Sequence, residues 1–76
     1  MHAEELTPRQ NEVVALIRQH ITAAGFPPST RELADALGVS STAVEGHLSA
    51  LQKKGVLRRS PGIARGIRIL TPGVAR

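Results

Sequence analysis

Residues 29–51 read STRELADALGVSSTAVEGHLSAL, a pattern that predicts two short helices separated by a tight turn. The first helix opens on a capping box formed by Ser29 and Glu32, and it ends at Gly38. Its inward-facing residues are predicted to be Leu33, Ala34 and Leu37. Two helices joined by so short a glycine-containing turn form a helix-turn-helix, whose second helix is able to enter a DNA major groove.

The second of these helices is predicted to begin at Ser40 or Ser41 and to run to about Lys54, where Gly55 stops it. Its core-facing residues, at positions i, i+4 and i+7, are Val44, Leu48 and Leu51. The opposite side carries Thr42, Gly46, Ser49 and Lys53, with Ser41 and Glu45 on its flank. This outward side is polar and almost free of bulky side chains, so it fits a major groove about 12 Å wide.

A longer helix and a hairpin flank the helix-turn-helix. The helix starts at the capping box of Thr7 and Gln10, ends at Gly25, and has an inward stripe predicted at Val13, Val14, Ile17, Ile21 and Ala24. Residues 56–59 and 66–70 are predicted strands, joined through the turn residues Ser60, Pro61 and Gly62. The fold class is therefore mainly α with a small antiparallel β-hairpin, a winged helix-turn-helix of three helices plus a wing. It is expected to span residues 1–70, and residues 71–76 form a tail or the start of a linker.

The composition limits the kind of protein. A chain of 76 residues, 41% of them hydrophobic, suits one globular domain. It has no cysteine, which excludes disulfides and thiolate metal sites. We expect no membrane span and no export signal, and therefore a cytoplasmic protein. Phe26 is its one aromatic residue, which argues against single-strand binding by base stacking.

Charge is unevenly distributed along the chain, whose formal net charge is +4. Residues 1–45 hold three basic and six acidic side chains, whereas residues 46–76 hold seven basic side chains and no acidic one. Candidate contacts to the DNA backbone or the minor groove are Lys53, Lys54, Arg58, Arg59, Arg65 and Arg68. Ser29, Thr30 and Arg31, at the start of a helix, offer amides and a cation to a phosphate. The alternative is a solvated basic face that keeps the chain soluble.

Five residues on or beside the outward helix side have both a functional and a structural interpretation. Gly46 costs the helix about 1 kcal/mol relative to alanine, which close approach to a base or a phosphate explains, as would tight packing. Glu45 is suited to accept a hydrogen bond from cytosine N4, or it complements the helix dipole. Ser40, Ser41 and Thr42 contact DNA or cap the helix.

Catalytic and metal-binding patterns are weak. His2, His20 and His47 show no ligand spacing, so no metal site and no cofactor are expected. Glu32 and Asp35 share one side of a short helix and are predicted to be solvated. No nucleophile, oxyanion site or phosphate loop is recognisable, so we expect no enzyme.

Residues 6–70 resemble the N-terminal DNA-binding domain of the LexA repressors of the bacterial SOS response. The matching stretches are Leu6-Thr7-Pro8-Arg9-Gln10, Gly25-Phe26-Pro27-Pro28-Ser29, Arg31-Glu32-Leu33, Gly46-His47-Leu48 with Leu51, Lys54-Gly55-Val56-Leu57-Arg58-Arg59, and Arg65-Gly66-Ile67-Arg68-Ile69-Leu70. The resemblance implies that the first half of the helix at residues 41–54 reads bases, here through Ser40, Ser41, Thr42, Glu45 and Gly46. Ser49, on the same outward side, is a further candidate for base reading. The resemblance also implies that His47 touches a phosphate. The self-cleaving half of that family lies beyond the matched residues.

The function implied is sequence-specific binding of double-stranded DNA at a palindromic operator, by a repressor of transcription. So small a module is expected to be a monomer in solution and to pair on DNA. The alternative is a winged-helix protein-interaction module whose charged hairpin docks on an acidic partner. That alternative predicts an exposed apolar patch on the helix at residues 41–54.

Overall fold

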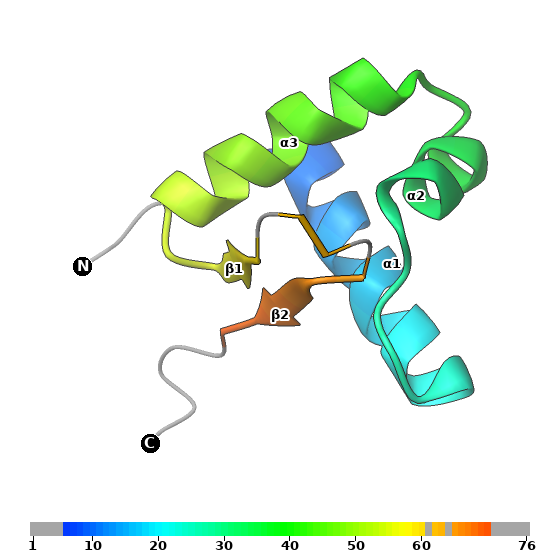
Figure 1. The fold of residues 1–76 in the computed structure, drawn as a ribbon. Helices are drawn as coiled ribbons and strands as arrows, with labels where there is room; N and C mark the ends of the chain where they lie inside the picture. The colour runs from blue at the N-terminus through cyan, green and yellow to red at the C-terminus, as the bar shows by residue number, and fades with distance from the viewer. Residues whose placement is uncertain (1–5, 61, 64, 71–76) are drawn as a thin grey trace.

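The computed structural model describes residues 6–60, 62–63 and 65–70. Its elements are α1 (Pro8–Ala24), α2 (Thr30–Leu37), α3 (Ser41–Lys53), β1 (Leu57–Arg59) and β2 (Ile67–Ile69). The three helices pack around one core, and the two strands pair as an antiparallel hairpin beside α3 and in front of α1 (Figure 1). This arrangement is a winged helix-turn-helix, as predicted. Pro61, His2 and the tail at residues 71–76 lie outside the described residues.

The helix starts are fixed by side chains that cap them. Thr7 and Gln10 form the predicted capping box of α1, and Ser29 and Glu32 form that of α2. For α3, the hydroxyl of Ser40 accepts from the backbone N–H of Ala43 at 3.1 Å, which makes Ser40 the cap. Each side chain satisfies a backbone donor that the helix itself leaves unpaired. The start of each of the three helices is thus determined by residues within a few positions of it.

The turn between α2 and α3 depends on Gly38, whose φ is +72°. Its backbone N–H and that of Val39 both donate to the carbonyl of Ala34, at 2.9 and 3.1 Å. Only glycine adopts this left-handed conformation at little cost, so the turn stays tight and α3 leaves α2 at a steep angle (Figure 1). At its other end α3 stops at Lys53, one residue before the predicted limit.

The hairpin strands are shorter than predicted. They pair over three residues each, in the register Leu57 with Ile69, Arg58 with Arg68 and Arg59 with Ile67. Backbone bonds beyond the strands, from Leu70 to Val56 and from Ser60 to Gly66, each 2.8 Å long, extend the ladder at both ends. Because strand side chains alternate, Leu57 and Ile67 lie in the core while Arg58 and Arg68 are exposed.

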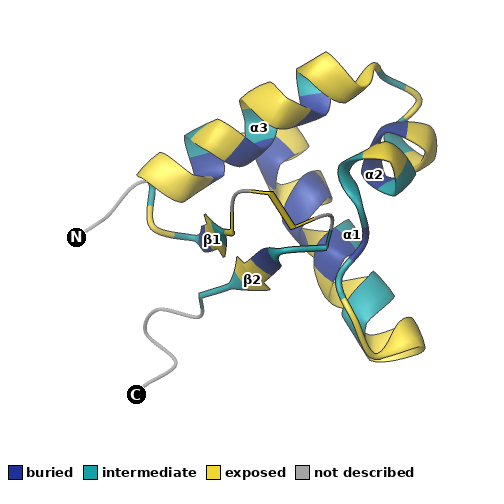
Figure 2. Cartoon of the chain, in the orientation of Figure 1, coloured by how far each residue is buried: buried dark blue, intermediate teal, exposed yellow. Residues whose placement is uncertain are grey.

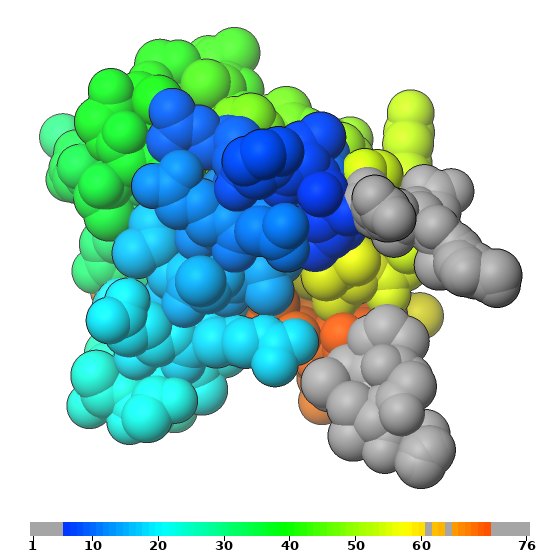
Figure 3. All heavy atoms as spheres, turned by 180° about the vertical axis from the view of Figure 1, so that it is seen from behind, coloured from blue at the N-terminus to red at the C-terminus, as the bar shows by residue number. Residues whose placement is uncertain are grey.

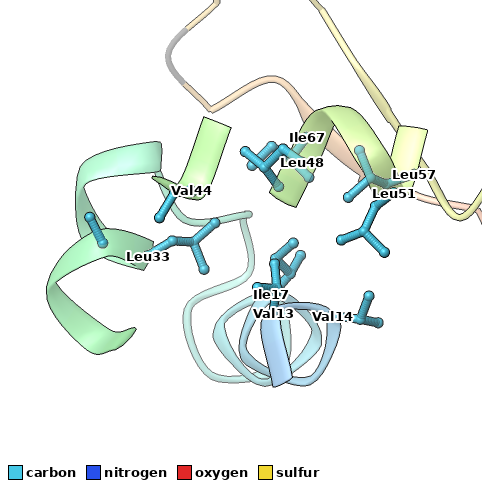
Figure 4. Close-up of a cluster of buried hydrophobic side chains, with 10 residues drawn as sticks. Val13, Val14, Ile17, Leu33, Val44, Leu48, Leu51, Leu57 and Ile67 are labelled. Atoms are coloured by element: carbon cyan, nitrogen blue, oxygen red, sulfur yellow. The ribbon is translucent and has the colours of Figure 1, made fainter. Parts of the chain in front are cut away.

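The core takes residues from every element, as Figure 4 shows. Its buried hydrophobic members are Val13, Val14, Ile17, Leu33, Ala34, Val44, Leu48, Leu51, Leu57 and Ile67. Burying one of the larger side chains stabilises the fold by about 1.5–3 kcal/mol. Ile21, Leu37 and Ile69 pack against this core but are only half-buried. Figure 2 shows the buried residues on the inward sides of the elements and a continuous exposed strip along α3.

The prediction is wrong for one core residue. Ala24 is exposed, although it lies on the inward stripe of α1. A helix of 17 residues is about 25 Å long, and the last turn of α1 projects beyond the elements that pack on it (Figure 1). The apolar spacing of the sequence continues to the end of α1, whereas the elements that pack against α1 end before its last turn. The spacing alone therefore did not show that Ala24 is exposed.

Candidate nucleic-acid interface

The exposed strip of α3 is formed by the residues predicted to read bases. Ser40, at the cap, precedes it, and its members are Ser41, Thr42, Glu45, Gly46 and Ser49, all exposed. We call these six residues the α3 face. A Cβ atom added to Gly46 would meet nothing within 4 Å, so tight packing within the protein does not explain this glycine. The α3 face is therefore slender and polar, as predicted, and the fold leaves it open.

Glu45 does not stand alone on this face. Its carboxylate accepts two parallel hydrogen bonds from the guanidinium of Arg59 on β1, at 2.6 Å (Nη1 to Oε1) and 3.2 Å (Nη2 to Oε2). The hydroxyl of Thr30, the first residue of α2, donates to Oε2 at 3.4 Å. The Arg59 hydrogen bonds lower the pKa of Glu45. Sequence reasoning missed this pair, because its members lie 14 residues apart in different elements.

Arg65, in the wing, is anchored to the start of α2. Its guanidinium donates to both oxygens of Glu32, at 2.7 and 2.9 Å, and to the carbonyl of Pro27 at 2.9 Å. It also lies over the ring of Phe26, 4.7 Å from the centroid. The bond from Arg65, with that from the Ser29 backbone, lowers the pKa of Glu32 from 4.5 to about 2. Glu32 was predicted to be solvated; it is instead paired, because the wing folds back onto it.

His20 completes this cluster from α1. Its Nδ1 lies 2.8 Å from the carbonyl oxygen of Phe26, and its Nε2 lies 3.7 Å from Oε1 of Glu32. The rings of His20 and Phe26 are 5.6 Å apart. We call Glu32, Arg65, Phe26 and His20 the wing anchor, since together they connect the wing to α1 and α2.

The other residues that were predicted to contact the DNA backbone differ in how exposed they are. Arg31, Lys53, Arg58 and Arg68 are exposed, while Ser29 and His47 are half-buried. Lys54 is half-buried and its Nζ donates to Oε1 of Gln10 at 2.7 Å, which connects the end of α3 to the start of α1. Arg58 and Arg68 are directly opposite each other in the hairpin register. Like charges in that position destabilise a hairpin, so this pair is unfavourable unless an anion lies beside it.

Two hollows border the wing. One lies between α3 and the wing and is lined by Ser49, Gln52, Arg59, Ser60, Gly62 and Ile63. The other lies on the wing beside Pro27 and is lined by Pro27, Arg58, Ser60, Arg65, Gly66, Ile67 and Arg68. Each of the two is lined by at least one arginine. Figure 3 shows the opposite side of the molecule, where α1 forms much of the surface. The hollow between α3 and the wing brings Ser49 of the α3 face beside Arg59.

Other kinds of site find little support in the part of the chain that the structure describes. No group of three histidine, aspartate or glutamate side chains is placed to hold a metal ion there. None of the described helices has both the length and the apolar character needed to cross a bilayer.

Comparison with known proteins identifies the family. Residues 3–66 match the family model of the LexA DNA binding domain. The chain is 52% identical over 69 residues to a LexA repressor of Tolumonas auensis, covering 90% of this chain and 34% of that protein. It is 48% identical over 71 residues to a LexA repressor of Geobacter metallireducens, covering 92% and 35%, and 47% identical over 74 residues to one of Bordetella pertussis, covering 96% and 34%. The chain spans about a third of the length of these curated relatives. With its three helices, wing and matched residues, the chain belongs to the LexA DNA-binding domain family.

Proposed function

We propose that this chain binds double-stranded DNA sequence-specifically, as the operator-binding domain of a LexA-like transcriptional repressor of the SOS response. In this proposal α3 lies in the major groove and the wing contacts the backbone or the minor groove. The observation that carries it is the α3 face, a continuous exposed strip of small polar residues on a helix whose other side is fully buried. The family membership of the chain supports the same function.

The dimensions of α3 suit a major groove. B-DNA offers a groove about 12 Å wide, close to the diameter of a helix with its side chains. Serine, threonine and glycine on the α3 face let the helix axis approach the bases closely. Thr42 and Ser49 supply hydroxyl groups that bond to base edges, and the methyl group of Thr42 suits the methyl group of thymine.

The wing supplies the charges that phosphates require. Arg58 and Arg68 are exposed and mutually repulsive, and a phosphate beside them relieves this repulsion. Lys53, at the end of α3, and Arg31, near the start of α2, are exposed cations on two other elements. Backbone contacts of this kind fix the position of a protein on the duplex without reading its sequence.

A palindromic operator with one chain on each half-site is the expected target. One small module makes few base contacts, and specific affinity is usually built from two modules related by the symmetry of the DNA. We therefore infer that the chain is a monomer in solution and pairs on DNA.

A protein-interaction module is the competing function. It requires an exposed apolar patch on α3, whereas the α3 face is polar. Among the described residues, the large exposed hydrophobics are Phe26, 46% exposed, and Ile63, 63% exposed, and neither belongs to α3. DNA binding is therefore the better-supported function.

The test starts from a selection of bound sequences out of random duplexes, followed by titration at two salt concentrations. Thr42→Ala is expected to change the preference at one base pair, by about tenfold, and to leave the salt dependence as it was. Thr22→Ala, the same substitution at an exposed position of α1, serves as the control and should leave the sequence profile intact. A wild-type chain that binds every duplex alike, or binds none, contradicts the proposal.

A further inference from the structure

The pair of Glu45 and Arg59 joins the α3 face to the wing. Both side chains reach the solvent, with exposed fractions of 49% for Glu45 and 31% for Arg59. The guanidinium and the carboxylate meet as two planar forks, since each nitrogen of the pair donates to a different oxygen. This geometry holds the plane of the carboxylate in one orientation, which a single contact does not do.

The hydrogen bonds to Glu45 do not use all the acceptor positions of its carboxylate. A carboxylate offers about four acceptor positions, two on each oxygen. Oε2 accepts from Arg59 and from Thr30, whereas Oε1 accepts, among the described residues, only from Arg59. One acceptor position on Oε1 is therefore open, next to the exposed strip of α3.

The charge of the pair matters as much as its geometry. A carboxylate beside a DNA duplex repels phosphates, and this repulsion weakens binding to every sequence. Arg59 cancels the charge of Glu45 and also keeps the carboxylate ionised, since its hydrogen bonds lower the pKa of Glu45. Arg59 still has three N–H donors beyond the two that it gives to Glu45.

We propose that Arg59 is a positioning residue for base recognition: its bidentate contact holds Glu45 so that the open acceptor position on Oε1 meets the exocyclic amino group of a cytosine in the major groove. This inference rests on the proposed DNA binding and goes further, because it assigns a specificity-determining role to a wing residue through a residue of α3. The base edge, cytosine N4, is the one already expected for Glu45 from the sequence, and the new element is the role of Arg59.

Arg59→Lys separates the geometry from the charge. Lysine keeps the positive charge but offers no planar fork, so the carboxylate of Glu45 is no longer held in one plane. We expect the discrimination at one base pair to fall about tenfold, while the slope of binding against salt concentration stays the same. Arg18→Lys, at an exposed position of α1, is the matched control and should leave the sequence profile unchanged. The measurement is a selection from random duplexes followed by competition among duplexes that differ at that base pair.

Glu45→Gln tests the same contact from the other side. It removes the charge that Arg59 neutralises, so binding to random duplexes should become tighter and more dependent on salt. The preference should change at the same base pair that Arg59→Lys affects. Thermal unfolding of each variant accompanies the binding measurements, and it should show little change, since exposed ion pairs contribute little to stability.

Three results overturn the inference. The first is an Arg59→Lys profile identical to that of the wild type, and the second is a change at different base pairs in the two variants. The third is a Glu45→Gln profile without any change, which also decides the matter if Arg59→Lys fails to fold. The proposed function fails separately, when the wild-type chain itself shows no sequence preference.

Discussion

Gly46 is the residue whose identity the folded protein explains least. It lies inside a helix, where glycine costs stability, and nothing in the molecule crowds the space where a side chain would extend. Its neighbour Glu45, in contrast, is held by partners from two other elements. At the scale of single residues, α3 thus has two adjacent positions of opposite character: the side chain of Glu45 is held in place, and Gly46 has no side chain.

Replacing Gly46 by alanine should separate stability from binding. Gly46→Ala is expected to stabilise the fold by about 1 kcal/mol, and to raise the midpoint of thermal unfolding by ~4–8 °C, because alanine is the better helix former. The added methyl group should weaken binding to the selected duplex by about tenfold, since it occupies space that we assign to the DNA. Calorimetry and a binding titration check both effects. An unchanged affinity would show that this glycine does not serve close approach.

Glu32 gives the fold a measurable dependence on pH. Its pKa is about 2 in the folded protein and 4.5 ordinarily, so its contact with Arg65 stabilises the fold fully above pH ~4.5. This contribution is lost as the pH falls toward 2. Because both side chains of this pair are partly exposed, the effect is small: Glu32→Gln should unfold at a slightly lower temperature than the wild type at pH 6, and the difference should narrow between pH 4.5 and 2.

Asp35→Asn is the control for that experiment. It removes an acid from the same helix while the contact of Arg65 with Glu32 stays in place. Its unfolding temperature should therefore change with pH as that of the wild type does. A constant difference between wild type and Glu32→Gln across this pH range would exclude the proposed role of the ion pair.

At the scale of elements, the helices could be predicted and the contacts between elements could not. Thr7, Ser29 and Ser40 cap helices through atoms three residues away, so the signal lies within a few positions of sequence. Glu45 and Arg59 lie 14 residues apart, and Glu32 and Arg65 lie 33 residues apart. No local spacing in the sequence predicts these two pairs. The site was therefore predicted as a set of residues, while their partners required the fold.

The wing offers a prediction of its own. Arg58→Ala removes one of two arginines that oppose each other, so it should lower affinity for all duplexes and reduce the slope of log affinity against log salt by about 1. Relief of the repulsion should leave the fold as stable as before or slightly more stable. Salt-dependent titrations and thermal unfolding measure the two effects, with Arg18→Ala on α1 as control. A change of preference at a single base pair would instead assign Arg58 to base reading.

At the scale of the whole molecule, folding pairs some of the basic side chains with acidic ones that lie far away in the sequence. The sequence places seven cations and no acid in residues 46–76. In the structure two of these cations, Arg59 and Arg65, are paired with acids from the first 45 residues. The positive field is thus smaller than the sequence suggests and is concentrated on the exposed cations, among them Lys53, Arg58 and Arg68.

The proposed pairing on DNA is a prediction about the assembled molecule. Sedimentation of the chain alone should give a monomer, whereas a duplex with a palindromic site should bind two chains. A duplex with a single half-site should bind one chain with weaker affinity, because each module contributes only part of the specific contacts. A dimer formed without DNA, or one chain on the full palindrome, would contradict this prediction.

The short hairpin also constrains how the chain tolerates changes in length. Leu57, Ile67, Arg58 and Arg68 alternate between the interior and the solvent. Deleting or adding one residue within either strand would exchange the two sides, bringing a guanidinium inward and turning an aliphatic side chain toward water. Evolution of this wing is therefore expected to proceed by substitution within the strands, with insertions admitted only where the strands are joined.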